Sequence, residues 1–151
     1  MDDKYILIVD DDEEIQESFS AILGMKGYRV NMAKDGREAL QMVLNKYYHL
    51  ALIDIKLPDM EGTELLAEFH EINPQMKKVI ITGRATLDNA IESLNLKADG
   101  YLKKPVKPGE LLGLVADKLM EQEMEIKDYE DTVSELINAK MQDDRGLDRY
   151  A

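Results

Sequence analysis

Short apolar runs alternate with amphipathic stretches along most of this chain. Residues 5–9 (Tyr-Ile-Leu-Ile-Val) form a continuous run with β-branched members, which is typical of a strand covered on both faces. Similar runs predict four more strands, at residues 28–32, 50–53, 78–82 and 99–102. Apolar residues at helical spacing follow each strand and predict helices over residues 13–25, 35–44, 61–72 and 86–96 and from residue 108 onward.

Five βα units in succession predict an α/β fold, in which a parallel sheet carries helices on both faces. Right-handed crossovers leave few topologies, and we expect a doubly wound, flavodoxin-like sheet with strand order 2-1-3-4-5. Local signals agree with these elements: Asp35 and Glu38 are spaced as a helix cap, and Pro108 suits the first turn of the last helix.

The chain divides by composition near residue 120. We expect one globular domain over residues 1–120 and an acidic helical extension over residues 121–151, frayed from Arg145 onward. Apolar residues continue into the extension at steps of three, four and three, namely Ile126, Tyr129, Val133 and Leu136. This stripe has three open interpretations: it packs on its own domain, pairs with a second copy as a short coiled coil, or leads into a deleted output domain.

Composition limits the partners. The 151 residues carry a formal net charge of −12, which argues against a surface for nucleic acid or anionic membrane. The sequence contains no cysteine, so disulfides and thiolate chemistry are excluded. No apolar run approaches the length of a membrane span, and we expect a soluble, cytoplasmic protein.

Chemically competent side chains gather where the predicted strands end. Asp10 and Asp11 follow the first strand, Asp54 the third, Thr82 ends the fourth and Lys104 follows the fifth. Ligands of open parallel sheets bind at the carboxyl ends of the strands, so these groups should meet at one edge. Clustered carboxylates repel one another, and a hard cation such as Mg2+ resolves that repulsion. An aspartate can itself attack phosphorus.

Four segments together resemble a response-regulator receiver domain of two-component signal transduction. They are Ile6–Asp12 (ILIVDDD), Leu52–Gly62 (LIDIKLPDMEG), Thr82-Gly83 and Gly100–Pro105 (GYLKKP). The segments occur in the order and spacing of that family, and the resemblance covers roughly residues 4–120. It implies a phosphorylation-activated signalling switch, which catalyses only its own phosphoryl transfer and dephosphorylation.

By this resemblance, Asp54 would be the phosphoacceptor, and a sensor histidine kinase or phosphotransfer protein would supply the phosphoryl group. Asp10, Asp11 and Asp54 would hold Mg2+, joined by the main-chain carbonyl of Lys56. The downstream protein target is not indicated by any motif. A homodimer is compatible with the extension, whereas nucleic acid and membrane are not expected partners.

The resemblance also assigns a switch. Thr82 would hydrogen-bond the phosphoryl group, and Lys104 would pair with it, since Lys104 directly precedes Pro105 as the lysine of the family does. Tyr101 would change rotamer with Thr82 and so alter the face made by helix 4, strand 5 and helix 5.

Three other functions compete with this interpretation. A phosphohydrolase of the haloacid-dehalogenase type needs a second Asp two positions after its nucleophile, and that position holds Lys56. A DNA-binding regulator needs a basic helix-turn-helix, and nothing after residue 120 offers one. A phosphorylation-independent adaptor or dimerisation module remains the alternative. Asp12 is interpreted only as a helix cap.

Overall fold

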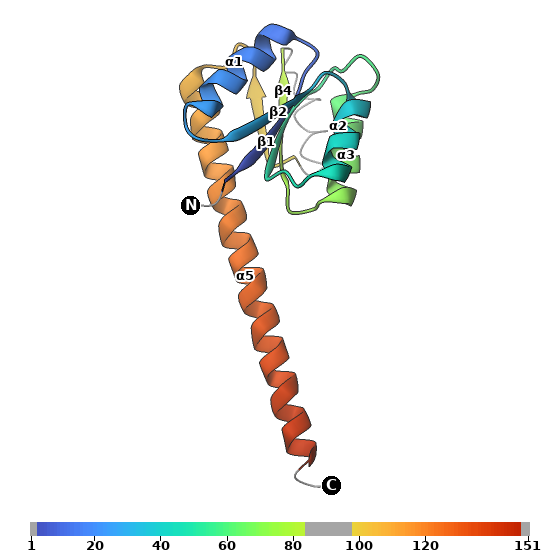
Figure 1. Cartoon of the computed structure of the whole chain (residues 1–151), viewed down its shortest axis with the longest axis vertical. Helices are drawn as coiled ribbons and strands as arrows, with labels where there is room; N and C mark the ends of the chain where they lie inside the picture. Colours follow the sequence, from blue (N-terminus) through green and yellow to red (C-terminus); the bar gives the residue numbers. More distant parts are fainter. Residues whose placement is uncertain (1–2, 84–97, 149–151) are drawn as a thin grey trace.

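The computed structural model describes residues 3–83 and 98–148, and it shows one sheet covered by helices (Figure 1). All strands of the sheet are parallel, and their order is β2-β1-β3-β4-β5, which confirms the predicted topology. The strands are β1 (Tyr5–Val9), β2 (Arg29–Ala33), β3 (Leu50–Asp54), β4 (Lys77–Thr82) and β5 (Gly100–Lys103).

Helices lie on both faces of the sheet, as Figure 1 shows. Those of the described residues are α1 (Glu13–Gly24), α2 (Gly36–Asn45), α3 (Gly62–Ile72) and α5 (Pro108–Asp148). Each described strand and helix begins within one residue of its predicted start. The helix predicted over residues 86–96 lies outside the described residues.

The sheet is buried on both faces, which explains its continuous apolar runs. Along β1, Leu7 and Val9 face one core cluster with α2 and α3, while Ile6 and Ile8 face the other with α1 and α5. Every residue of β3 is buried. Since a parallel strand has no solvated face, alternation of polar and apolar residues disappears from the sequence.

Short polar side chains fix where the helices begin. The Asp12 carboxylate accepts from the main-chain N–H of Glu14 at 2.9 Å, which confirms Asp12 as a cap of α1. Asp35 accepts from the N–H of Glu38 at 2.8 Å and caps α2. Each cap satisfies donors that the first helical turn leaves unpaired.

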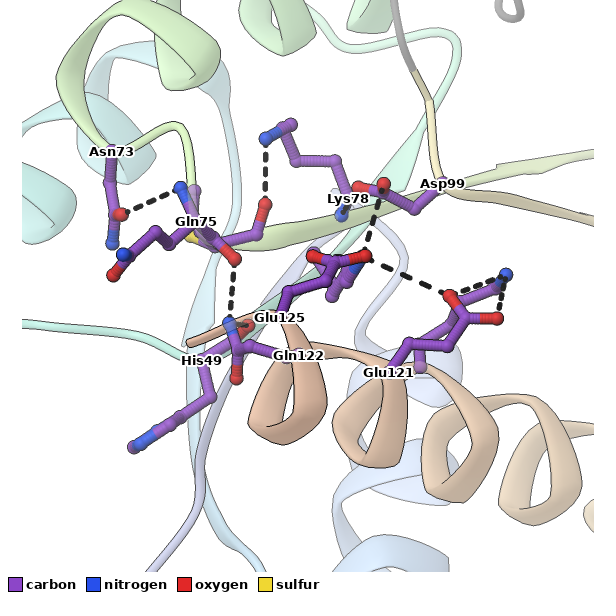
Figure 2. Close-up of polar contacts among 11 residues, drawn as sticks. His49, Asn73, Gln75, Lys78, Asp99, Glu121, Gln122 and Glu125 are labelled. Atoms are coloured by element: carbon purple, nitrogen blue, oxygen red, sulfur yellow. Dashed lines mark hydrogen bonds and ion pairs between the residues drawn. The ribbon is translucent and has the colours of Figure 1, made fainter. Parts of the chain in front are cut away.

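Helix α5 crosses the sheet, passes its amino edge and continues alone (Figure 1). Polar contacts fasten it at that edge, and Figure 2 shows Gln122 and Glu125 among the side chains that make them. The Gln122 amide donates to the carbonyls of His49 (2.8 Å) and Gln75 (2.7 Å). The Lys77 ammonium donates to both oxygens of Glu125, at 2.9 and 3.0 Å.

The helix continues through Arg145 and Gly146 to Asp148, past the point where the sequence suggested fraying. A single glycine lowers helix stability by only about 1 kcal/mol, which is too little to end a helix by itself. Among the described helices, none combines the length and hydrophobicity that crossing a bilayer requires.

Because the sheet is buried, the same Leu→Ala substitution should change the free energy of unfolding much more in the sheet than on an exposed helix face. Leu52 is fully buried in β3, whereas Leu44 on α2 is 68% exposed. We expect Leu52→Ala to lower the free energy of unfolding by about 2–5 kcal/mol, because it leaves a cavity. Leu44→Ala should change it by less than about 0.5 kcal/mol. Urea unfolding measures both, and equal losses would contradict the described packing.

Candidate functional site

Three carboxylates meet at the carboxyl edge of the sheet. Asp10 follows β1 and Asp54 ends β3, and these two strands are neighbours in the sheet. Oxygen atoms of Asp10, Asp11 and Asp54 all lie within 4.8 Å of one another. Asp10 and Asp54 are buried, at 2% and 9% exposure, while Asp11 is exposed. The group offers oxygen ligands from one exposed and two buried residues to a hard cation.

Lys104 brings a positive charge to the two buried carboxylates. Its ammonium lies 3.0 Å from Oδ2 of Asp10 and 3.4 Å from Oδ2 of Asp54. The Lys104 N–H also donates to the carbonyl of Thr82 at 2.7 Å, and the Lys104–Pro105 peptide bond is cis. The lysine is therefore positioned by the ends of both β4 and β5.

The ionisation of these groups reflects their crowding. Burial, and then the negative charge of Asp10, raise the pKa of Asp54 above its ordinary value, although Lys104 opposes both effects. Burial on its own would lower the pKa of Lys104. The hydrogen bond and charge of Asp10, together with the charge of Asp54, raise the pKa by more than burial lowers it. The pKa of Lys104 therefore lies above its ordinary value.

A compact loop between β3 and α3 holds Asp54 in place. The N–H of Lys56 donates to Oδ1 of Asp54 at 3.2 Å, and the N–H of Gly62 donates to the carbonyl of Ile55 at 2.7 Å. A Cβ at Gly62 would collide with the main-chain carbonyl of Asp54. Glycine is therefore required where α3 begins, because the helix approaches the Asp54 backbone so closely.

Thr82 and Tyr101 lie on the neighbouring strands β4 and β5. Thr82 is 1% exposed and pairs in register with Lys103, one residue before the site lysine. The Tyr101 ring packs against the core cluster shared with α2 and α3. Its hydroxyl is buried and has no hydrogen-bond partner within the described part of the chain.

Two residues that the sequence analysis did not identify support the site. The Gln16 amide of α1 donates to the carbonyl of Asp10 at 2.6 Å and to that of Ala33 at 3.2 Å, which joins the ends of β1 and β2. The Asp59 carboxylate accepts from the N–H groups of Gly36 (2.9 Å) and Arg37 (3.0 Å).

These two hydrogen bonds lower the pKa of Asp59. They also tie the loop that follows Asp54 to the first turn of α2. The only sequence signal for this contact is an acidic residue in a turn, which does not indicate its partner.

The response regulator receiver domain model matches residues 6–116 of the chain. The chain belongs to this family. Receiver domains are signalling domains of two-component systems rather than metabolic enzymes, and the family is known for phosphorylation and for Mg2+ at its acidic pocket.

Curated relatives are longer proteins. The transcriptional regulatory protein DltR of Streptococcus agalactiae is 34% identical over 110 residues, which are 73% of this chain and 49% of the relative. The transcriptional regulatory protein ZraR of Klebsiella oxytoca is 40% identical over 101 residues, or 67% of this chain and 23% of the relative. The chain thus spans about half or less of these relatives.

Solved structures of similar size share the fold. A CheY-like receiver domain protein from Methanospirillum hungatei is 51% identical with a TM-score of 0.80, over 82% of this chain and 99% of that one. Chemotaxis protein CheY4 of Vibrio cholerae is 27% identical with a TM-score of 0.73, over 77% of this chain and 98% of that one.

The charges of Asp54, at the end of β3, and Asp59, in the following loop, should affect the free energy of unfolding with opposite signs. The raised pKa of Asp54 means that the folded state binds its proton more tightly than the unfolded chain does. The ionised group therefore lowers stability at pH 7, and this penalty is lost as pH falls through its folded-state pKa. We expect Asp54→Asn to raise the free energy of unfolding at pH 7, less so at pH 5, in urea unfolding without divalent cations.

Asp59→Asn is the matched control, because the pKa of Asp59 is lowered instead. Its charge stabilises the fold above the unfolded-state pKa, and that stability is lost as pH falls through the folded-state pKa. Asp59→Asn should therefore lower the free energy of unfolding at pH 7. The same sign for both substitutions would contradict the electrostatics described here.

Proposed function

We propose that this protein is a phosphorylation-activated switch that accepts a phosphoryl group on Asp54. The observation that carries the proposal is the meeting of Asp54 with Asp10, Asp11 and Lys104 at one edge of the sheet. One carboxylate oxygen of Asp54 faces the ammonium, and the other accepts a main-chain N–H. The carboxylate is thereby oriented before any phosphoryl donor arrives.

The transfer itself needs only one bond exchange. A carboxylate oxygen of Asp54 attacks the phosphorus of a phosphohistidine, an O–P bond forms, and the N–P bond breaks with its electron pair staying on the imidazole. The phosphoryl oxygens carry spread negative charge, which Lys104 is placed to stabilise. Thr82, at the end of β4, would supply a hydroxyl donor to the same group.

The residues present fit Mg2+. The cluster consists of carboxylates without nitrogen or sulfur ligands, and the donor set that Mg2+ prefers is one or two carboxylates with waters and phosphate. Asp10, Asp11 and Asp54 would hold the ion, joined by the carbonyl of Lys56. When bound, Mg2+ would neutralise the excess carboxylate charge and attract the phosphoryl oxygens.

The output would be a change in protein binding or self-association. Thr82 lies on β4 two residues after Ile80, the register partner of Tyr101 on β5, so a shift of Thr82 toward phosphate would free space for the Tyr101 ring. The donor would be a cytoplasmic sensor histidine kinase or phosphotransfer protein. The net charge of −12 disfavours DNA as a partner of this chain.

Intact mass spectrometry tests the phosphoacceptor directly. After incubation with acetyl phosphate and Mg2+, the wild-type protein should gain one phosphoryl group, and omission of Mg2+ should abolish the gain. Asp54→Asn should gain none, while Asp59→Asn, which changes a carboxyl in the same loop, should still be modified. If folded protein forms no adduct and binds no beryllofluoride, the adaptor alternative replaces this proposal.

The two adjacent lysines provide a second, matched test. Lys104 contacts both buried carboxylates, whereas its neighbour Lys103 is exposed. We expect Lys104→Gln to slow adduct formation about a hundredfold, because it removes the cation beside the transferred group. Lys103→Gln should leave the rate nearly unchanged. Equal rates for the two variants would show that Lys104 does not stabilise the transfer.

A further inference from the structure

The peptide that joins Asp10 to Asp11 lies just beyond the end of β1. The backbone pairing of β1 with β2 ends at Val9 and Ala33, and the carbonyl of Asp10 follows the last of these pairs. The two residues that this peptide joins supply two of the three carboxylates that meet at the edge of the sheet. Because a peptide is planar, turning it changes the main-chain dihedral angles on both of its sides. Its orientation therefore decides how the two carboxylates stand relative to each other.

A side chain of α1 holds this peptide. The Gln16 amide donates to the carbonyl of Asp10 at 2.6 Å and to the carbonyl of Ala33 at 3.2 Å. An amide nitrogen carries two hydrogen atoms, so it can serve both acceptors at once. Ala33 is fully buried at the end of β2, and its carbonyl also accepts from the N–H of Asp10 at 3.0 Å. Gln16 thus ties the peptide to a buried point of the sheet.

Gln16 is itself held in place by its helix. Its N–H donates to the carbonyl of Asp12 at 3.1 Å, and α1 packs on the core through Phe19 and Leu23, which are both buried. The N–H of Asp12 in turn donates to Oδ1 of Asp10 at 2.9 Å. The side chain and the main chain of Asp10 are therefore both fixed from the start of α1.

We propose that Gln16 is a positioning residue that sets the carboxylates of Asp10 and Asp11 for a small cation and so favours Mg2+ over larger ones. Its role rests on the proposed function, in which this edge binds Mg2+. Mg2+ requires near-ideal octahedral coordination at about 2.0–2.1 Å, whereas Ca2+ accepts oxygen ligands at about 2.3–2.6 Å in flexible geometry. Loosening the peptide between the two carboxylates should therefore weaken the binding of Mg2+ more than that of Ca2+.

The opposite edge of the sheet offers a matched control. There the Gln122 amide also joins two main-chain carbonyls, those of His49 at 2.8 Å and Gln75 at 2.7 Å (Figure 2). Replacing either glutamine by methionine keeps the length of the side chain and removes the same two hydrogen bonds. Only Gln16 contacts one of the clustered aspartates, so the pair separates positioning of the site from general stabilisation of the fold.

Calorimetric titration of the whole, unphosphorylated chain with Mg2+ and with Ca2+ tests the role of Gln16. We expect Gln16→Met to raise the Mg2+ dissociation constant about tenfold, as loss of a group that orients a metal ligand does. The Ca2+ dissociation constant should rise less than about threefold, because Ca2+ tolerates displaced ligands. Gln122→Met should change neither constant, although both variants should unfold at lower urea concentration than the wild-type protein.

Two different failures of this titration are distinguishable. Unchanged Mg2+ binding by Gln16→Met, or equal weakening for both cations, would overturn the role of Gln16 and leave the proposed Mg2+ site standing. Wild-type protein that binds no Mg2+ would overturn both.

Amide hydrogen exchange without metal tests the geometry itself. The N–H of Asp12, which donates to Asp10, should exchange about tenfold faster in Gln16→Met and at the wild-type rate in Gln122→Met. Gln16→Lys should keep the wild-type rate, because its ammonium can donate to both carbonyls and the open cavity that Gln16 lines has room for it. Equal acceleration in both methionine variants, or in Gln16→Lys as well, would overturn the assignment.

Discussion

Two buried carboxylates, Asp10 and Asp54, meet because β1 and β3 are neighbours in the sheet. Like charges at this separation disfavour one another, and one ammonium from Lys104 does not neutralise the three carboxylates of the edge. The site therefore retains a deficit of positive charge, which favours binding of a cation. A bound cation in turn makes the same place attractive to a phosphoryl group.

The rest of the body keeps this unfavourable arrangement in place. The strands beneath the carboxylates are buried on both faces, so the ends of β1 and β3 have little freedom to separate. Gln16 joins the end of β1 to β2, and Asp59 ties the following loop to α2. Packing of the core thus holds the carboxylates together although their mutual repulsion favours separation.

Sequence patterns were sufficient for the sheet, its strand order and the residues that gather at its edge. They succeeded because burial on both faces produces unbroken apolar runs, and because parallel strands bring their carboxyl ends together. Residues whose environment depends on distant partners were missed. The apolar run predicts a fourth strand that starts at Lys78, whereas β4 starts at Lys77, which is 5% exposed. Its position depends on Glu125, which is 48 residues away and leaves no local signal.

Helix α5 is anchored to the body at the edge of the sheet that lies opposite the carboxylate cluster. Its anchor, formed by Gln122 with Lys77 and Glu125, lies at the amino edge of the sheet, and the carboxylates lie at the opposite edge. β4 spans this distance with six residues, or roughly 20 Å. The projecting part of α5 therefore leaves the body at the edge of the sheet opposite the carboxylates (Figure 1). A protein bound to the projecting part of α5 would therefore leave the carboxylate edge of the sheet uncovered.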